Sequence, residues 1–459
     1  MLPHSKPSLR WSRVLAWLGG SVAAIAVVGY FGSSILLNHY LHGESFRALL
    51  NEKTSAFFAT DGQYLPIHCE GFSFYSDRYA ARGSNGVPVK ELRADQIRAD
   101  FEPGALFQGA WQVSNLQIQR VRVALNTAPA APLPLQTASP KRHSRWIPER
   151  FELKRARIEE TNIEWSPTGR EGSLLNMRLV LEPNGRDLIA TGYGGRLQQA
   201  GWPALNVDHV KLRCRYPDLF LTDSLFQIGE SENIVVSGQA GLGQSRAVDL
   251  LVKFNGIAIS PYLPVDWRAG VKGNANGEAR VTGSIDDAAS LQSTGSISLA
   301  GGQLEALPIL EKIAAFTRTR QFRRFPLQKA EANFTCVGSK IVVSKLLAES
   351  EGLIRMEGGF TVEGGIVQGT FQLGVTPESL HWLPGSRTRV FTQEHDSYAW
   401  TVVKISGPVD NLAEDLSARL VAAAGDEVIE GVKGTIESGV KSSIEGAKGL
   451  FDLLKPLAP

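Results

Sequence analysis

The sequence has few of the residues that mark metal proteins or disulfide-rich proteins. Only 3 of its 459 residues are cysteines. Cys69, Cys214 and Cys336 lie far apart, at no spacing typical of a metal site. Each lies in an alternating stretch with apolar neighbours, which favours small buried side chains over a disulfide framework. The sequence leaves open whether one pair closes in an oxidising compartment.

The motifs of common enzyme classes are also missing. The chain has no His-Glu-x-x-His, no Gly-x-Ser-x-Gly and no phosphate-binding loop. Its 8 histidines are scattered, and the adjacent Glu394, His395 and Asp396 would point their side chains in different directions. We therefore expect no catalytic residues, no metal site, no cofactor and no enzymatic activity.

Neither sign of charge dominates. The chain has 48 Lys and Arg against 46 Asp and Glu, a formal net charge of +2. This balance argues against a nucleic-acid partner, which normally requires a concentrated basic surface. The 46 glycines, above the usual share of about 7%, indicate a protein with many turns.

One apolar run stands out near the start of the chain. Residues 14–37 carry no charge, and about 20 such residues suffice for a helix to cross a bilayer. Lys6, Arg10 and Arg13 precede the run, whereas the nearest following cation is Arg47. A signal peptide would have a shorter apolar core and a small-residue cleavage site. The pattern predicts a single-pass inner-membrane anchor with residues 1–13 in the cytoplasm and the body in the periplasm.

Most of the remaining chain follows the period of a β-strand. From Val210 to Tyr216, apolar side chains alternate with Lys211, Arg213 and Arg215, so one face of the strand is dry and the other wet. We predict a mainly β fold: a long, curved, mostly antiparallel sheet that forms an open groove or trough. A leading helix is expected from Ser45, where Phe46, Leu49, Leu50, Phe57 and Phe58 share one face.

Changes in composition divide the chain into segments. The expected segments are a first β-groove segment over 45–125, a proline-rich linker or loop over 126–148, a central β-groove segment over 149–293, a C-terminal β region over 294–409, and C-terminal helices over 412–455. The last helix, from Asp426, is amphipathic, but its glycines weaken its intrinsic propensity. We expect it to need a surface to pack on.

The β region over 294–409 resembles the C-terminal region of AsmA-like bacterial envelope proteins. The resemblance rests on Gly295-Ser-Ile-Ser-Leu-Ala-Gly-Gly-Gln-Leu, on a helical pattern through Leu310 and Phe316, and on glycine-spaced strands after it. The plan of one anchor followed by β-rich sequence fits the same family. The resemblance implies an elongated grooved sheet beyond an inner membrane, linked to lipid transport and outer-membrane homeostasis.

Two functions follow from an apolar sheet face of this length. In the first, the face holds or conducts phospholipid acyl chains. In the second, it is an ordinary core, and the protein is a non-catalytic periplasmic scaffold that supports outer-membrane assembly. The predicted partners are phospholipids, the inner membrane and other envelope proteins. The groove residues predicted by strand parity are Val210, Leu212, Val252, Phe254, Ile297, Leu299, Ile354, Met356, Phe360, Val362, Val367, Phe371 and Leu373.

A cluster of arginines is the candidate for lipid headgroups. Arg318, Arg320, Arg323 and Arg324 have Phe322 and Phe325 between them and no acid nearby. Guanidinium groups bind phosphates through paired hydrogen bonds, while neighbouring aromatic rings suit acyl chains. The alternative is a solvated helix end favoured by the helix dipole.

Overall fold

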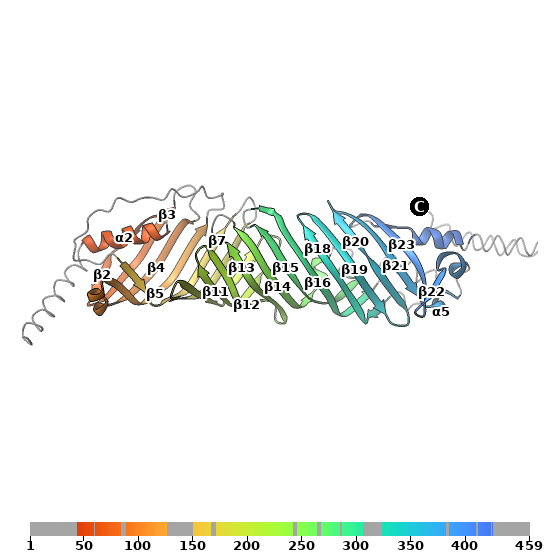
Figure 1. Ribbon diagram of the computed structural model, residues 1–459, viewed down its shortest axis with the longest axis horizontal. Coiled ribbons are helices and arrows are strands. Elements are labelled where there is room, and N and C mark those ends of the chain that lie inside the picture. Colours follow the sequence, from red (N-terminus) through yellow and green to blue (C-terminus); the bar gives the residue numbers. More distant parts are fainter. Residues whose placement is uncertain are drawn as a thin grey trace, which may run out of the picture. The chain divides into compact units, whose positions relative to one another are not determined.

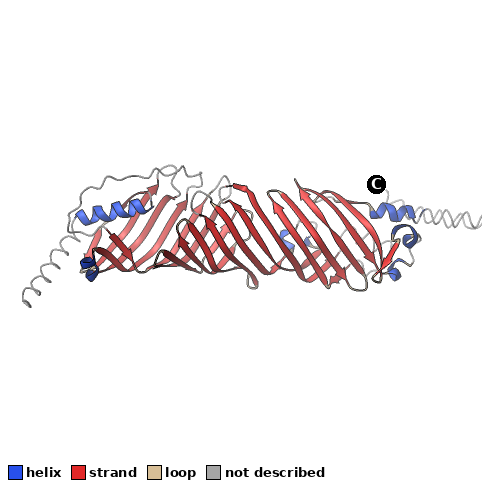
Figure 2. Ribbon diagram, viewed as in Figure 1, coloured by secondary structure: helices blue, strands red, loops and turns tan. Residues whose placement is uncertain are grey.

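The computed structural model describes residues 44–58, 60–83, 89–125, 150–166, 171–241, 246–263, 268–284, 287–305, 324–381, 385–409, 412–423 and 425. These residues are mainly β, as predicted, and Figure 2 shows how few helices accompany the strands. They divide into two compact units, with the boundary between Arg215 and Tyr216. That boundary lies inside the predicted central segment 149–293.

The first unit contains one helix and eleven strands among its described residues. These are α2 (Glu44–Phe58), β1 (Thr60–Tyr64), β2 (Ile67–Glu70), β3 (Ser73–Gly83), β4 (Val89–Glu102), β5 (Ala110–Leu125), β6 (Arg150–Leu153), β7 (Ala156–Trp165), β8 (Gly172–Asn184), β9 (Asp187–Tyr193), β10 (Arg196–Gln199) and β11 (Leu205–Arg215), with a short 3-10 helix, η1 (Pro103–Gln108), before β5. Residues 73–83 form one continuous strand.

Pairing in the first unit is antiparallel with one exception. β5 pairs in parallel with β6 and β7, for example Ile118 with Ile158. A parallel pair requires a long connection that returns to the starting end of the first strand. The predicted proline-rich linker or loop over 126–148 falls between Leu125 and Arg150 and lies outside the described residues.

α2 covers part of the first sheet. Phe46 is 0% exposed and its ring centroid lies 5.4 Å from that of Trp111. Around it the sheet contributes a buried cluster that includes Phe74, Leu92 and Phe101. The predicted helix and the burial of Phe46 and Leu49 are confirmed, and Figure 1 shows the helix alongside β3 and β4.

The second unit contains thirteen strands among its described residues, all paired antiparallel. They are β12 (Asp218–Ile228), β13 (Glu232–Gly241), β14 (Ala247–Ala258), β15 (Val271–Ser284), β16 (Asp287–Glu305), β17 (Arg324–Leu327), β18 (Lys329–Val337), β19 (Lys340–Ser350), β20 (Ile354–Glu363), β21 (Ile366–Val375), β22 (Gln393–His395), β23 (Tyr398–Pro408) and β24 (Ala413–Glu414). Each strand from β12 to β16 pairs with the next. β16 pairs with β17 and β18, β18 to β21 follow in order, and β23 lies between β21 and the short β22 and β24.

Short helical segments close one end of the second sheet. These are α5 (Pro377–Leu380), the π-helical turn η4 (Ser386–Val390) and a helix over 416–423. A further short 3-10 helix, η2 (Ser260–Tyr262), lies between β14 and β15. Leu380, Phe391, Leu416 and Leu420 from this end are all at most 4% exposed. They pack with Val375 and other residues of the sheet in one buried cluster. We call the 416–423 helix the cap helix.

Candidate functional site

Cross-strand register builds a continuous apolar row in the second unit. Residues paired across antiparallel strands share a face of the sheet, so the pairings can be followed from β13 to β23. The row is Val236, Val252, Ala279, Gly295, Phe334, Val343, Phe360, Gly369 and Ile405. We call it the central apolar row. It crosses nine strands without a charged residue.

The predicted groove residues of this unit all lie on the same face as the central apolar row. Phe254 pairs with Gly277, and Gly277 pairs with Ile297. Val362 pairs with Val367, and Met356 pairs with Leu373. The face is therefore apolar over several neighbouring rows. The parity argument for these positions agrees with the register.

The exposure of this face changes along the sheet. Ile354, Val367, Phe371 and Leu373 are buried, at 5–6% exposure, and Ile354 and Leu373 belong to the cluster that the cap helix completes. The other predicted residues of this unit, Val252, Phe254, Ile297, Leu299, Met356, Phe360 and Val362, are half-buried. Neither buried cluster among the described residues includes Val252, Phe254 or Ile297. Their face is apolar but only partly covered.

Two glycines on this face leave room for the rings of phenylalanines on the neighbouring strands. Gly277 pairs with Phe254 and Gly295 with Phe334. A Cβ at either glycine would lie 2.8 Å or 2.9 Å from the Cζ atom of the ring and closer still to a backbone carbonyl. Because only glycine leaves that space free, each ring packs directly over the glycine of the neighbouring strand. The rings therefore form part of the apolar surface close to the backbone of the sheet.

The first unit carries comparable rows. Leu116, Ala156, Leu181, Ala190 and Leu212 pair in sequence from β5 to β11. Cys69, Phe74 and Ala99 continue this row on the other side. Val210 lies on the neighbouring row with Ile158, Leu179 and Gly192. Val210 and Leu212 are half-buried, as are the three cysteines, which all lie in the described residues and form no disulfide.

The opposite face of the second sheet carries ion pairs as well as exposed apolar side chains, such as Leu251 beside Arg280. Arg280 lies 2.7 Å from Asp249, and Lys272 lies 3.3 Å from Glu305. The hydrogen bonds from Arg280 hold the pKa of the Asp249 carboxyl below its ordinary value. These pairs are largely exposed, so each contributes little to stability. Within each of these pairs the two charges offset one another.

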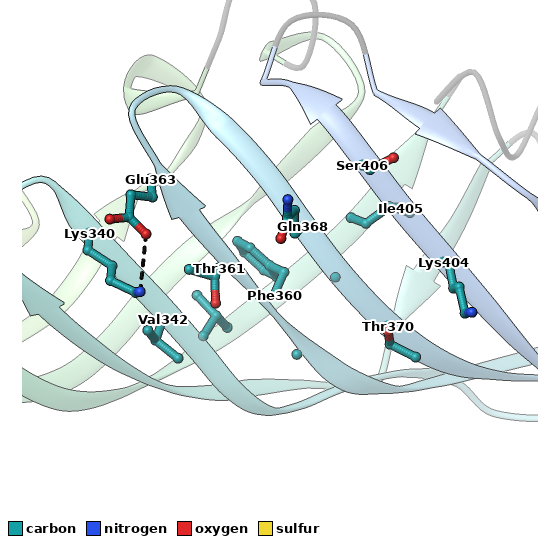
Figure 3. Close-up of a pocket in the computed structure, with 13 residues that line it drawn as sticks. Lys340, Val342, Phe360, Thr361, Glu363, Gln368, Thr370, Lys404, Ile405 and Ser406 are labelled. Carbon is teal, nitrogen blue, oxygen red and sulfur yellow. Dashed lines mark ion pairs between the residues drawn. The ribbon is translucent and has the colours of Figure 1, made fainter.

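A shallow hollow of about 700 Å³ lies on this polar face (Figure 3). Two cross-strand rows line it, Thr361, Gln368 and Ser406 in one, Gly359, Thr370 and Lys404 in the other. Val343, Phe360, Gly369 and Ile405 of the central apolar row also contribute to its lining. Lys340 and Glu363 form an ion pair of 3.1 Å at its edge. With Lys340, Glu363 and Lys404 in its mixed lining, the hollow suits hydrocarbon less well than the continuous apolar face does.

Among the described residues, no three His, Cys, Asp and Glu side chains are grouped to hold a metal ion. Glu394 pairs with Arg387 at 2.6 Å, and the His395 ring stacks on Trp400 with centroids 4.8 Å apart. The Glu394, His395 and Asp396 run therefore consists of residues with separate structural contacts.

No family model, no curated protein and no solved structure matches this chain. The resemblance to AsmA-like proteins therefore stays a prediction. The chemistry of the two sheet faces has to carry the functional argument.

The predicted headgroup arginines lie mostly outside the described residues. Only Arg324 is described, at the start of β17. It is exposed and lies 4.0 Å from Glu305, so an acid is close in space although none is close in the sequence. Phe325 belongs to the buried cluster at the capped end of the sheet. The sequence could not show this because the pairing of β16 with β17 brings Glu305 and Arg324 together.

The structure adds two residues that sequence reasoning missed. Arg419 on the cap helix donates from Nη2 to Thr401 Oγ1 at 2.9 Å and to the Val402 carbonyl at 2.7 Å. Thr401 pairs with Leu373, which places it on the apolar face. The lone Arg419 in an apolar helical stretch was the available signal, but its contact with β23 depends on how the helix folds back.

The membrane anchor cannot be compared with the structure. Residues 14–37 lie outside the described part of the chain, as does the amphipathic segment from 426. Among the described residues, no helix is long and apolar enough to cross a bilayer.

Proposed function

We propose that this chain is an inner-membrane-anchored envelope protein whose apolar sheet face binds or conducts phospholipid acyl chains. Residues 14–37 serve as the anchor, with the β units in the periplasm, and the uncovered part of the face forms an open groove. In this role the protein contributes to lipid transport and outer-membrane homeostasis. The AsmA-like resemblance and the charge asymmetry around the anchor support the same assignment.

The central apolar row carries the proposal. It crosses nine strands, its residues are almost all half-buried, and the rows beside it at Phe254 and Ile297 belong to no buried cluster among the described residues. Soluble monomers rarely expose continuous apolar patches of more than a few hundred Å². Flexible hydrocarbon chains would cover this face without demanding specific hydrogen bonds.

The scaffold hypothesis remains the second candidate. The capped end favours it locally, because Leu373 and Val375 pack against Leu416 and Leu420 as an ordinary core does. A scaffold would need another protein segment to cover Val252, Phe254 and Ile297. The two functions therefore differ in what occupies the half-buried part of the face.

A matched pair of aspartate substitutions tests the proposal. Ile297 and Ser296 are neighbours on opposite faces of β16, and Ser296 pairs with Glu278 on the polar face. An uncompensated carboxylate at 297 would be costly to bury against hydrocarbon. Ile297→Asp should strongly reduce the phospholipid that copurifies with the full chain, as measured by lipid extraction and mass spectrometry. Ser296→Asp should retain it.

The result that would overturn the proposal is equally clear. If the wild-type chain carries no lipid, or if both variants retain it equally while circular dichroism shows both folded, the apolar face does not bind acyl chains. The scaffold function would then replace it.

A further inference from the structure

The cap helix brings a single cation to the end of the apolar face. Leu416, Leu420 and Ala423 pack on the face through the cluster that contains Leu373 and Val403. Arg419 lies between the buried leucines in sequence, and its guanidinium reaches the sheet at Thr401 and Val402. The positive charge is therefore held against the edge of the same face that carries the central apolar row.

The hydrogen bonds of Arg419 are incomplete. Its Nη2 atom has two neutral acceptors, whereas Nε is buried and has no acceptor among the described residues. A half-buried guanidinium offers five N–H donors and loses hydration that only an anion fully replaces. Its acceptors among the described residues are one hydroxyl and one carbonyl.

Neighbouring carboxylates do not supply the missing anion. Asp415, one helical turn earlier, accepts a hydrogen bond of 2.8 Å from the backbone amide of Lys404 instead. Within the described residues no carboxylate lies at ion-pair distance from Arg419, although most arginines of this sheet have one, such as Arg280 with Asp249. Arg419 thus differs from the balanced pairs of the polar face.

The position of Arg419 suits an amphiphile. Thr401, Val403 and Ile405 alternate along β23 on the apolar face, and four residues of strand span roughly 14 Å. That distance separates Thr401, which Arg419 contacts, from the half-buried Ile405 of the central apolar row. An anionic group at Arg419 would leave an attached hydrocarbon chain next to apolar side chains.

We propose that Arg419, with the Thr401 hydroxyl, binds the phosphate group of a lipid whose acyl chains lie on the apolar face. This inference rests on the proposed function and adds the class of ligand and its orientation, with the headgroup at the capped end. Guanidinium groups hold phosphate through charge-assisted hydrogen bonds, which are about twice as strong as neutral ones. The lipid phosphate would then be the counterion of Arg419, for which the described residues supply no carboxylate.

Two lipids with identical acyl chains separate the headgroup from the chains. The delipidated full chain is titrated with diacylglycerol and with phosphatidic acid, which differ only in the phosphate. We expect wild type to bind phosphatidic acid at least about tenfold more tightly, consistent with one charge-assisted contact. Arg419→Gln should lose this preference and still bind diacylglycerol, which also shows that the variant is folded. Arg419→Lys should keep part of the preference for phosphatidic acid, because lysine retains the positive charge but lacks the paired N–H donors of the guanidinium.

The control variant and the competing ligand complete the experiment. Arg387→Gln removes an exposed arginine whose partner is Glu394 and should leave the preference intact. If Arg419→Gln keeps the full preference, or if inorganic phosphate alone binds the wild type as tightly as phosphatidic acid, the headgroup assignment is wrong. If neither lipid binds the wild type, the proposed function itself fails.

Discussion

At the scale of the residue, one half-buried tyrosine, Tyr64, makes the first unit sensitive to alkali. Burial raises the pKa of Tyr64 to about 12, and the nearby Tyr79 adds to the increase, whereas a hydrogen bond to Thr54 opposes it. In the unfolded chain the phenol would ionise near its ordinary pKa of about 10. Folding therefore favours the neutral phenol. The contribution of Tyr64 is complete below pH of about 10 and is lost as the pH rises toward 12.

We predict that Tyr64→Phe removes this part of the alkaline destabilisation. The measurement is the unfolding free energy of each variant across the alkaline range, followed by circular dichroism. Tyr193→Phe serves as the control, because Tyr193 is 48% exposed. Identical alkaline profiles for wild type and Tyr64→Phe would show that folding does not raise the pKa of Tyr64.

The face of the sheet on which a strand residue lies was the structural feature that the sequence predicted best. The alternation around Ile297 and Phe360 was enough to place both on the apolar face, because side chains of a strand point alternately to its two faces. Exposure was less predictable. Ile354 and Leu373 follow the same alternation but lie in the buried cluster with Leu416 and Leu420, and no strand pattern records which helix folds over them.

At the scale of the element, the two described helices of eight or more residues each pack on a sheet. α2 covers apolar side chains of the first sheet, and the cap helix covers those of the second. The sequence predicted a helix from Ser45 with one apolar face, and helices over 412–455. It did not show that Phe46 of α2 would pack on the sheet face against Trp111 and Phe101.

The packing of α2 gives a prediction for the first unit. Phe46 is fully buried, so Phe46→Ala should remove its contacts and leave a cavity, at a cost of about 3–5 kcal/mol. Hydrogen exchange should show faster exchange in α2 and in the strands beneath it. Ala48→Ser, at an exposed position of the same helix, is the matched control and should change stability by less than about 1 kcal/mol. Equal protection in both variants would contradict the described packing.

At the scale of the whole molecule, orientation across the membrane is the main prediction. Lys6, Arg10 and Arg13 precede the apolar run 14–37, and positive residues tend to stay in the cytoplasm. Alkaline phosphatase fused after Pro459 should be active, because that enzyme matures only after export. Replacing the three cations with glutamine should weaken the orientation. Cytoplasmic reporter activity with the wild-type sequence would rule out a periplasmic body.

The fold class was predictable at this scale, but the connections were not. Proline-rich composition marked 126–148 as a break in the sheet, yet the parallel pairing of β5 with β6 and β7 follows from where the chain returns. The pairing of β16 with both β17 and β18 is another such case. Sequence periodicity specifies which residues alternate along a strand. It does not specify which strand becomes the neighbour.

The most direct test of acyl-chain binding is photo-crosslinking at adjacent residues on opposite faces. A photoreactive amino acid is placed in the full chain at 252, 297 and 360 on the apolar face, and at 253, 296 and 361 on the polar face. These positions are better probes than 354 and 373, which are buried, or 355, where Arg355 lies within 3.6 Å of Glu349. We predict that the first three positions capture phospholipid in cells and the second three do not. Equal capture at both sets, or capture of protein alone at 252, 297 and 360, would contradict the account.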